Sequence, residues 1–226
     1  PDDLATIARL PRIPDIPGVP PPLAGRAFAV IDVVYDGDAA AGAELIAPLR
    51  ALGPEMDNVA TMPAPDLGRI HLDPEDPLPF IGNGFAVGPL PPAAIDAIIA
   101  AAGPASGSVL LQVELRHTGG ALARAPEGAG ALATIAGEFM THALGVPASP
   151  ELAAMIERDL AELDEALAGY RVGHFANFTE RPEPAAGFFP ADTLRRLETL
   201  RAEWDPGELF VARHVIDAAA PEATAA

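Results

Sequence analysis

The chain has 226 residues, half of them hydrophobic, and a formal net charge of −18 at pH 7. This length allows one large domain with a buried core, and the apolar content argues against disorder throughout the chain. The 14 basic residues are all arginine and are outnumbered by 32 acidic residues. We therefore expect neither a nucleic acid nor a membrane as partner, because nothing supplies a phosphate-neutralising patch.

Cysteine is absent, which excludes disulfides, thiolate metal sites and cysteine nucleophiles. No apolar run approaches the ~20 residues of a membrane-spanning helix. The chain begins at Pro1 rather than at a methionine, so we expect a fragment of a longer protein. Separately, we expect a cytoplasmic location.

The first third of the chain predicts one strand followed by one helix. Residues 1–10 fit either a short helix or a strand, and the proline-rich residues 11–22 fit an extended connection. Residues 26–35 are strongly apolar and predict a strand. A helix should follow over residues 39–52, and residues 54–79 are expected to be irregular.

The middle of the chain predicts further strands and two helices. Residues 80–87 and 108–118 read as strands on either side of a helix over residues 93–102. Residues 131–144 predict another strand, although their alanines also allow a helix. Ser149 is placed to cap a helix that ends near Gly169. Its apolar stripe consists of Leu152, Ile156, Leu160, Leu163 and Leu167.

The last part of the chain predicts a strand over residues 171–180, a helix from 190 or 191 to 204, and a disordered tail over residues 217–226. Strands interleaved with four helices indicate an α+β sheet with helices packed on one face. We divide the chain into residues 1–25, an N-terminal strand and proline-rich connection, and residues 26–216, one domain.

The strand over residues 108–118 has an apolar face and a mainly polar face. The first carries Val109, Leu111, Val113 and Leu115, and the second carries Leu110, Gln112, Glu114 and Arg116. Helices should cover the first face. The second is either a solvated face, with Glu114 and Arg116 as a neighbouring pair, or the lining of a substrate pocket.

The five histidines show no His-x-His or His-Glu-x-x-His spacing, so we expect no metal site. Glu138 and His142 lie too far apart for an acid–base dyad if their segment is a strand, whereas a helix would bring them together.

Residues 171–216 carry the most specific pattern in the chain. They contain Phe175-Ala176-Asn177-Phe178, then Trp204-Asp205-Pro206-Gly207-Glu208-Leu209-Phe210 after an arginine-rich helix, and a closing Arg213-His214-Val215-Ile216. An aromatic-x-Asn segment, a helix ending in Asp-Pro-x-x-Leu-Phe and a short final segment resemble the berberine-bridge-enzyme-like FAD-linked oxidases. In that family this stretch ends the substrate domain.

The resemblance implies a largely antiparallel sheet whose open face looks toward flavin and substrate. It also implies oxidation of an alcohol, a sugar or a secondary metabolite by hydride transfer to FAD. The FAD-binding domain, which would hold most of the cofactor, is expected to be missing from this chain. The chain alone should therefore be inactive and should pair with its own FAD-binding domain.

The resemblance also assigns roles to individual residues. Family members typically carry a tyrosine where this chain has Phe175, which has no titratable group. The proton acceptor is then expected to be Glu114 or a residue of the missing domain, and Asn177 is expected near the flavin. The residues expected to contact substrate are Gln112, Arg116, His142 and Phe175.

Two other hypotheses remain open. The chain can be a flavin-free binding domain of the same fold, or a dimeric ferredoxin-like binder of small molecules, which leaves the C-terminal pattern unexplained. In a severed domain, the sheet face with Gln112, Glu114 and Arg116 should be unusually open, and two copies pairing there would form a homodimer.

Overall fold

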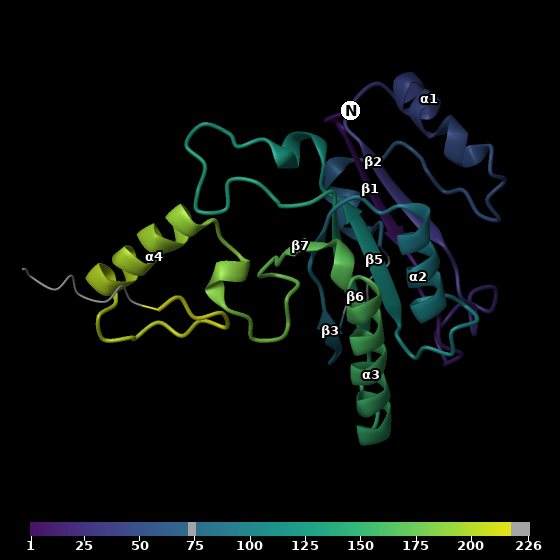
Figure 1. Ribbon diagram of the computed structural model, residues 1–226. Coiled ribbons are helices and arrows are strands. Elements are labelled where there is room, and N and C mark those ends of the chain that lie inside the picture. The colour runs from purple at the N-terminus through teal and green to yellow at the C-terminus, as the bar shows by residue number, and fades with distance from the viewer. Residues whose placement is uncertain (72–75, 218–226) are drawn as a thin grey trace, which may run out of the picture.

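The computed structural model describes residues 1–71 and 76–217, which form an α+β fold on one seven-stranded sheet (Figure 1). The strand order is β2-β1-β5-β6-β4-β7, and β3 pairs with β6 beside this path. Every strand pairing among the described residues is antiparallel, as expected. The strands are β1 (Leu4–Arg9), β2 (Val30–Tyr35), β3 (Ile81–Asn83), β4 (Ala86–Val87), β5 (Gln112–His117), β6 (Phe139–Gly145) and β7 (Arg171–Gly173).

Four α-helices accompany the sheet in the described ranges: α1 (Ala39–Arg50), α2 (Pro92–Ala102), α3 (Pro150–Ala166) and α4 (Ala191–Trp204). Short 3₁₀ turns, η1 to η4, cover Ala64–Arg69, Gly120–Ala123, Ala168–Tyr170 and Ala185–Gly187. No described helix is long and apolar enough to cross a membrane. Helix α3 begins as expected, because the Ser149 hydroxyl accepts a hydrogen bond from the Leu152 N–H at 3.2 Å.

The core lies between the sheet and the pair α2 and α3, which cover one face of it (Figure 1). The expected stripe of α3 packs there: Ile156, Leu160 and Leu167 are at most 1% exposed. They meet Val113 and Ala143 of the sheet. The prediction that Leu110 lies on the polar face is wrong, because Leu110 joins the same core. Strand β5 begins only at Gln112, so the alternation does not extend back to Leu110.

The N-terminal residues form a strand and not a helix. β1 pairs with both β2 and β5, so residues 1–25 supply an interior strand of the sheet. The expected strand over residues 80–87 is broken into β3 and β4. At Gly84, between them, a Cβ atom would lie 2.3 Å from the carbonyl oxygen of Thr141, so only glycine fits this close approach.

Two expected strands are much shorter than their sequence patterns indicate. Of residues 131–144 only the part from Phe139 onward is strand, and the preceding residues form a loop with Gly137 at φ +80°. β7 ends at Gly173, after which the His174 N–H bonds to Gly187 and not to a strand. Phe175 and Asn177 therefore lie on a turn, closed by the Thr179 N–H on the Phe175 carbonyl at 3.0 Å.

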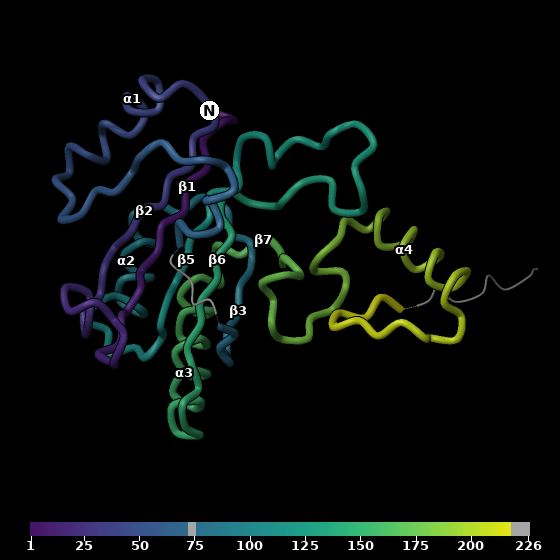
Figure 2. Tube along the Cα trace, turned by 180° about the vertical axis from the view of Figure 1, so that it is seen from behind, coloured from purple at the N-terminus to yellow at the C-terminus, as the bar shows by residue number. Residues whose placement is uncertain are grey.

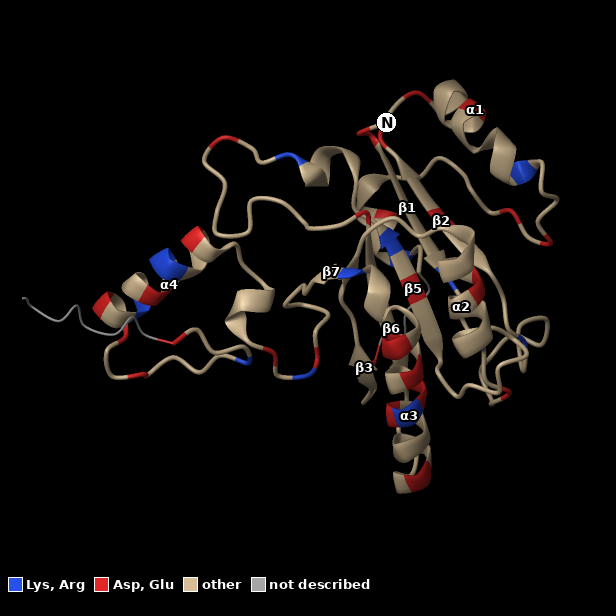
Figure 3. Cartoon of the chain, viewed as in Figure 1, with Lys and Arg blue, Asp and Glu red and all other residues tan. Residues whose placement is uncertain are grey.

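Helix α4 and the segment after it extend away from the sheet as an arm, seen from both sides in Figures 1 and 2. No residue of α4 is buried. Figure 3 shows acidic residues spread over many elements, α3 and α4 among them, with arginines scattered between them. The expected disordered tail lies outside the described residues, except for Asp217.

Candidate functional site

A row of polar side chains crosses three strands on the sheet face opposite α2 and α3. The strand register places Arg9 of β1 opposite Glu114 of β5, and Glu114 opposite His142 of β6. Residues paired directly on antiparallel strands project to the same side. Gln112 and Arg116 flank Glu114 on this face. The structure therefore gathers Gln112, Glu114, Arg116 and His142, four of the residues expected at the site.

One end of this row is an ion pair that the sequence patterns did not reveal. The Arg9 guanidinium donates Nε to Asp32 Oδ2 at 2.5 Å and Nη2 to Asp32 Oδ1 at 2.9 Å. Its Nη1 donates to Gln112 Oε1 at 3.3 Å and to the carbonyl of His71 at 3.2 Å. The connection between α1 and β3, which contains His71, therefore reaches the polar face of the sheet, as Figure 2 also shows. Arg9 thus joins β2, β5 and the connection before β3.

Glu114 lies at the centre of the row and is only 4% exposed. Its Oε1 accepts a hydrogen bond from Gln112 Nε2 at 2.5 Å, and its Oε2 accepts one from Arg116 Nε at 2.7 Å. The expectation of an unusually open face is therefore wrong at Glu114. The carboxylate is held on both oxygens by neighbours on its own strand.

His142 is the next member of the row and lies among aromatic rings. Its imidazole stacks on Phe178, with ring centroids 4.9 Å apart and planes inclined by 22°, and Phe80 meets it edge-on at 6.3 Å. The Arg116 guanidinium lies over the same Phe178 ring at 4.8 Å. Burial lowers the pKa of His142, the Glu114 charge opposes this and Arg116 adds to it, so the neutral imidazole is favoured near pH 7.

The extended conformation of β6 determines which of two glutamates, Glu114 or Glu138, lies beside His142. Glu138 precedes β6 and is exposed, and the strand keeps it away from His142, as expected for an extended segment. The acid beside His142 is instead Glu114, across the strand pair. Spacing along the sequence could not predict that these two residues are neighbours, because their pairing depends on the register between β5 and β6.

The turn after β7 carries the remaining expected residues. Phe175 touches Phe178 edge-to-face, with centroids 5.5 Å apart, so it adjoins the polar row through that ring. It also lines a hollow of about 230 Å³ together with residues of β7 and η4. Asn177 lies exposed on the same turn. The Thr179 hydroxyl fixes the turn by donating to the Gly84 carbonyl at 3.0 Å.

A second histidine cluster lies at the base of the arm. The Phe188 ring is 5.4 Å from His174 and 4.3 Å from His214, and His214 Nε2 lies 3.0 Å from the Thr179 carbonyl. Burial lowers the pKa of His174, while Glu183 at 4.0 Å opposes this. Within residues 1–71 and 76–217 no three acidic or histidine side chains gather as metal ligands would.

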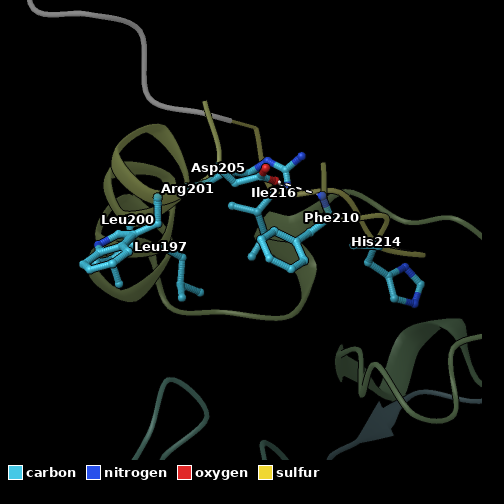
Figure 4. Close-up of a pocket in the computed structure, with 9 residues that line it drawn as sticks. Leu197, Leu200, Arg201, Asp205, Phe210, His214 and Ile216 are labelled. Atoms are coloured by element: carbon cyan, nitrogen blue, oxygen red, sulfur yellow. Dashed lines mark hydrogen bonds and ion pairs between the residues drawn. The ribbon is translucent and has the colours of Figure 1, made fainter. Parts of the chain in front are cut away.

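The arm has an apolar hollow of about 380 Å³ on its own surface. Figure 4 shows Leu197 and Leu200 of α4 facing Phe210 and Ile216, with the Arg201–Asp205 ion pair between the two segments. Beside it, Trp204 is 75% exposed and Phe210 72%. So much exposed apolar surface is typical of an interface.

Comparisons with known proteins agree on the fold. No protein-family model matches the sequence, and no curated protein matches it. Among solved structures, BBE-like 1 of Physcomitrella patens has a TM-score of 0.72 at 14% identity, with 96% of this chain covering 48% of that one. BBE-like 28 of Arabidopsis thaliana has a TM-score of 0.66 at 17% identity, with coverages of 97% and 51%.

A bacterial enzyme gives the same result. The 6-hydroxy-D-nicotine oxidase of Arthrobacter nicotinovorans has a TM-score of 0.67 at 18% identity, with coverages of 96% and 48%. The chain therefore spans about half the length of the structures that it matches. The likeness confirms the expected fold, an antiparallel sheet with helices on one face, as that of one half of such proteins.

Proposed function

We propose that this chain is the substrate-binding half of an FAD-dependent oxidoreductase that oxidises an alcohol, a sugar or a secondary metabolite. The observation that carries the proposal is the likeness over 96% of this chain to half of an oxidase and of two berberine-bridge-enzyme-like proteins. The polar row on the helix-free face supports it, because that face has the mixture of apolar walls and few polar groups typical of substrate sites.

The residues present fit one part of the cofactor. The aromatic surface formed by Phe178, His142 and the Arg116 guanidinium can pack against a planar flavin ring. The sequence has no glycine-rich phosphate cradle, so the dinucleotide part of FAD must be held by another unit. FAD, when bound, supplies the hydride acceptor. Asn177 on the exposed turn is the further cofactor contact that we propose.

The chain's own residues bind and orient the substrate. Phe175 and Phe80 offer apolar contact at the two ends of the aromatic cluster, while Gln112 and Arg116 fix the Glu114 carboxylate. Glu114 and His142 are the two candidates for taking the substrate proton. Phe175 itself cannot take it, since its ring has no titratable group.

We further propose that the arm packs against the FAD-binding unit. Four apolar side chains of this arm are more than 70% exposed: Trp204, Leu209, Phe210 and Val211, at 75, 84, 72 and 99%. Burial of such side chains against a partner contributes ~1.5–3 kcal/mol each when complete. Trp204 is the only tryptophan, so its fluorescence reports this docking directly.

A flavin-free binding domain is the second candidate. It is favoured by Phe175, which stands at the position where the berberine-bridge-enzyme-like family typically carries a tyrosine.

The visible absorbance spectrum of protein purified from the complete open reading frame tests both. A flavin band that bleaches when candidate alcohols or sugars are added is the expected result. A colourless protein that also takes up no added FAD would contradict the oxidoreductase and favour the binding domain.

A further inference from the structure

The family resemblance offers Glu114 or a residue of the missing domain as proton acceptor, but the geometry around the Glu114 carboxylate argues against that role. Oε1 and Oε2 each accept a short, strong hydrogen bond, from Gln112 and from the cationic Arg116. Both carboxylate oxygens are therefore already engaged by neighbours on the same strand, one of them by a charged donor. The side chain is also 4% exposed, so a substrate has little access to either oxygen.

His142 is held differently, by ring contacts with Phe178 and Phe80. Its ring extends from β6 toward β3, and its Nε2 lies over Gly82, where a Cβ atom would come within 3.3 Å of it. Gly82 pairs with Leu144 and so faces the same side of the sheet as His142. Glycine at position 82 therefore leaves room beside the Nε2 edge that a larger residue would fill, while Phe178 stacks on the ring.

The charged groups around His142 come from two elements. Glu114 and Arg116 face it from β5, and Glu180 acts on it from the turn after β7. β3 contributes Ile81, Gly82 and Asn83, none of which titrates. Burial lowers the pKa of His142, so the imidazole is neutral and its ring can accept a proton near pH 7. Glu114 and Glu180 then stabilise the imidazolium that forms.

We propose that His142 accepts the substrate's proton and that Glu114 is a positioning residue, whose fixed negative charge stabilises the protonated ring. This inference rests on the proposed function. For an alcohol, the O–H bond breaks and its proton passes to a ring nitrogen of His142. FAD, when bound, would supply the acceptor for the carbon-bound hydrogen and its electron pair, and the alcohol would then become a carbonyl compound.

The test measures proton affinity and access at His142 without any cofactor. Titration of the histidine ring signals by NMR gives the pKa of His142 in the native chain and in three variants. Glu114→Gln should lower this pKa and Arg116→Gln should raise it, because the two charges act in opposite directions. Glu138→Gln removes an exposed carboxylate just before β6 and should leave it unchanged.

Acylation by diethyl pyrocarbonate, located by mass spectrometry of the peptides, measures access. We expect His142 to react at a rate that rises with pH about a midpoint below 6.5, its ordinary pKa. The exposed His117 is the internal control for reagent reactivity.

The proposal is overturned if His142 stays unmodified while His117 reacts, or if the Glu114 and Arg116 variants shift its pKa in the same direction. Both measurements are independent of flavin. A protein that passes them yet never binds FAD contradicts the proposed function, and with it the role of His142 in oxidation. A protein whose complete form binds FAD, but in which His142 of the cofactor-free chain is unreactive, contradicts only this inference.

Discussion

The contact between β6 and α3 predicts that a substitution at Gly145 changes stability, with a sign that depends on the side chain of Ile156. A Cβ atom at Gly145 would lie 2.6 Å from Cγ1 of Ile156, 2.8 Å from its Cδ1 and 3.2 Å from its Cγ2. All three atoms belong to one side chain, which is completely buried. Gly145→Ala therefore overpacks a single site, and Ile156→Ala removes every atom of that clash.

The magnitudes follow from the two effects at Gly145. Overpacking typically costs ~1–3 kcal/mol, while replacing a strand glycine by alanine returns ~0.5–1 kcal/mol of backbone entropy. Gly145→Ala should thus destabilise the native chain by about 1 kcal/mol. Ile156→Ala should cost about 4 kcal/mol through lost burial and a cavity. In that background, Gly145→Ala should instead stabilise the protein, by about 0.5 kcal/mol.

Urea unfolding followed by far-UV circular dichroism on the four proteins of this cycle measures the coupling, expected at about 1.5 kcal/mol. Gly169→Ala is the matched control, because no atom lies within 4 Å of its added Cβ; it should change stability equally in both backgrounds. An equal cost for Gly145→Ala with and without the Ile156 side chain would refute the reasoning, since the clash would then lie elsewhere.

Three further predictions concern the elements around the site. Arg9→Met should cost about 3 kcal/mol in urea unfolding, because it leaves the Asp32 carboxylate buried without its bidentate partner; Asp32→Asn in the same chain should recover part of the loss. Ser149→Ala should cost about 1 kcal/mol by removing the cap of α3, and Ser149→Asp should retain most of it. Burial raises the pKa of Asp164 above its ordinary 3.8, against Arg171 and Arg181, so the folded state holds this proton longer than the unfolded state. The native chain should therefore lose stability relative to Asp164→Asn as pH rises from 3.8 through the folded pKa, and an unchanged difference between the two proteins over that range would contradict it.

The helices were predictable because their signals are local. The Ser149 cap and the stripe from Ile156 to Leu167 set the start and the buried side of α3 within one stretch of sequence. Strand ends were less predictable, because they depend on the partner. Residues 174–180 read as strand by composition, but the His174 N–H finds its acceptor at Gly187, and the chain turns there.

The site residues along strand β5 were predictable, whereas their neighbours on other strands were not. The period of two along β5 placed Gln112, Glu114 and Arg116 on one face without any knowledge of the sheet. The neighbours across the sheet, Arg9 and His142, depend on a register fixed by pairing between distant segments. No local pattern encodes that register, which is why His142 was expected at the site but not beside Glu114.

The architecture divides the chain into a part that stabilises itself and a part that does not. The sheet with α2 and α3 buries a continuous core, and the polar row rests on it with its ion pairs made inside the same chain. Helix α4 has 14 residues and buries none of them, a length at which an isolated helix is marginal in water. Its connections to the sheet run through the turn after β7, where His214 meets Thr179 and Arg213 meets Glu180. That same turn holds Phe178 over His142. A partner that packs on the arm therefore docks on an element joined to the turn that carries Phe178, one of the two rings that lie against the proposed proton acceptor, the other being Phe80.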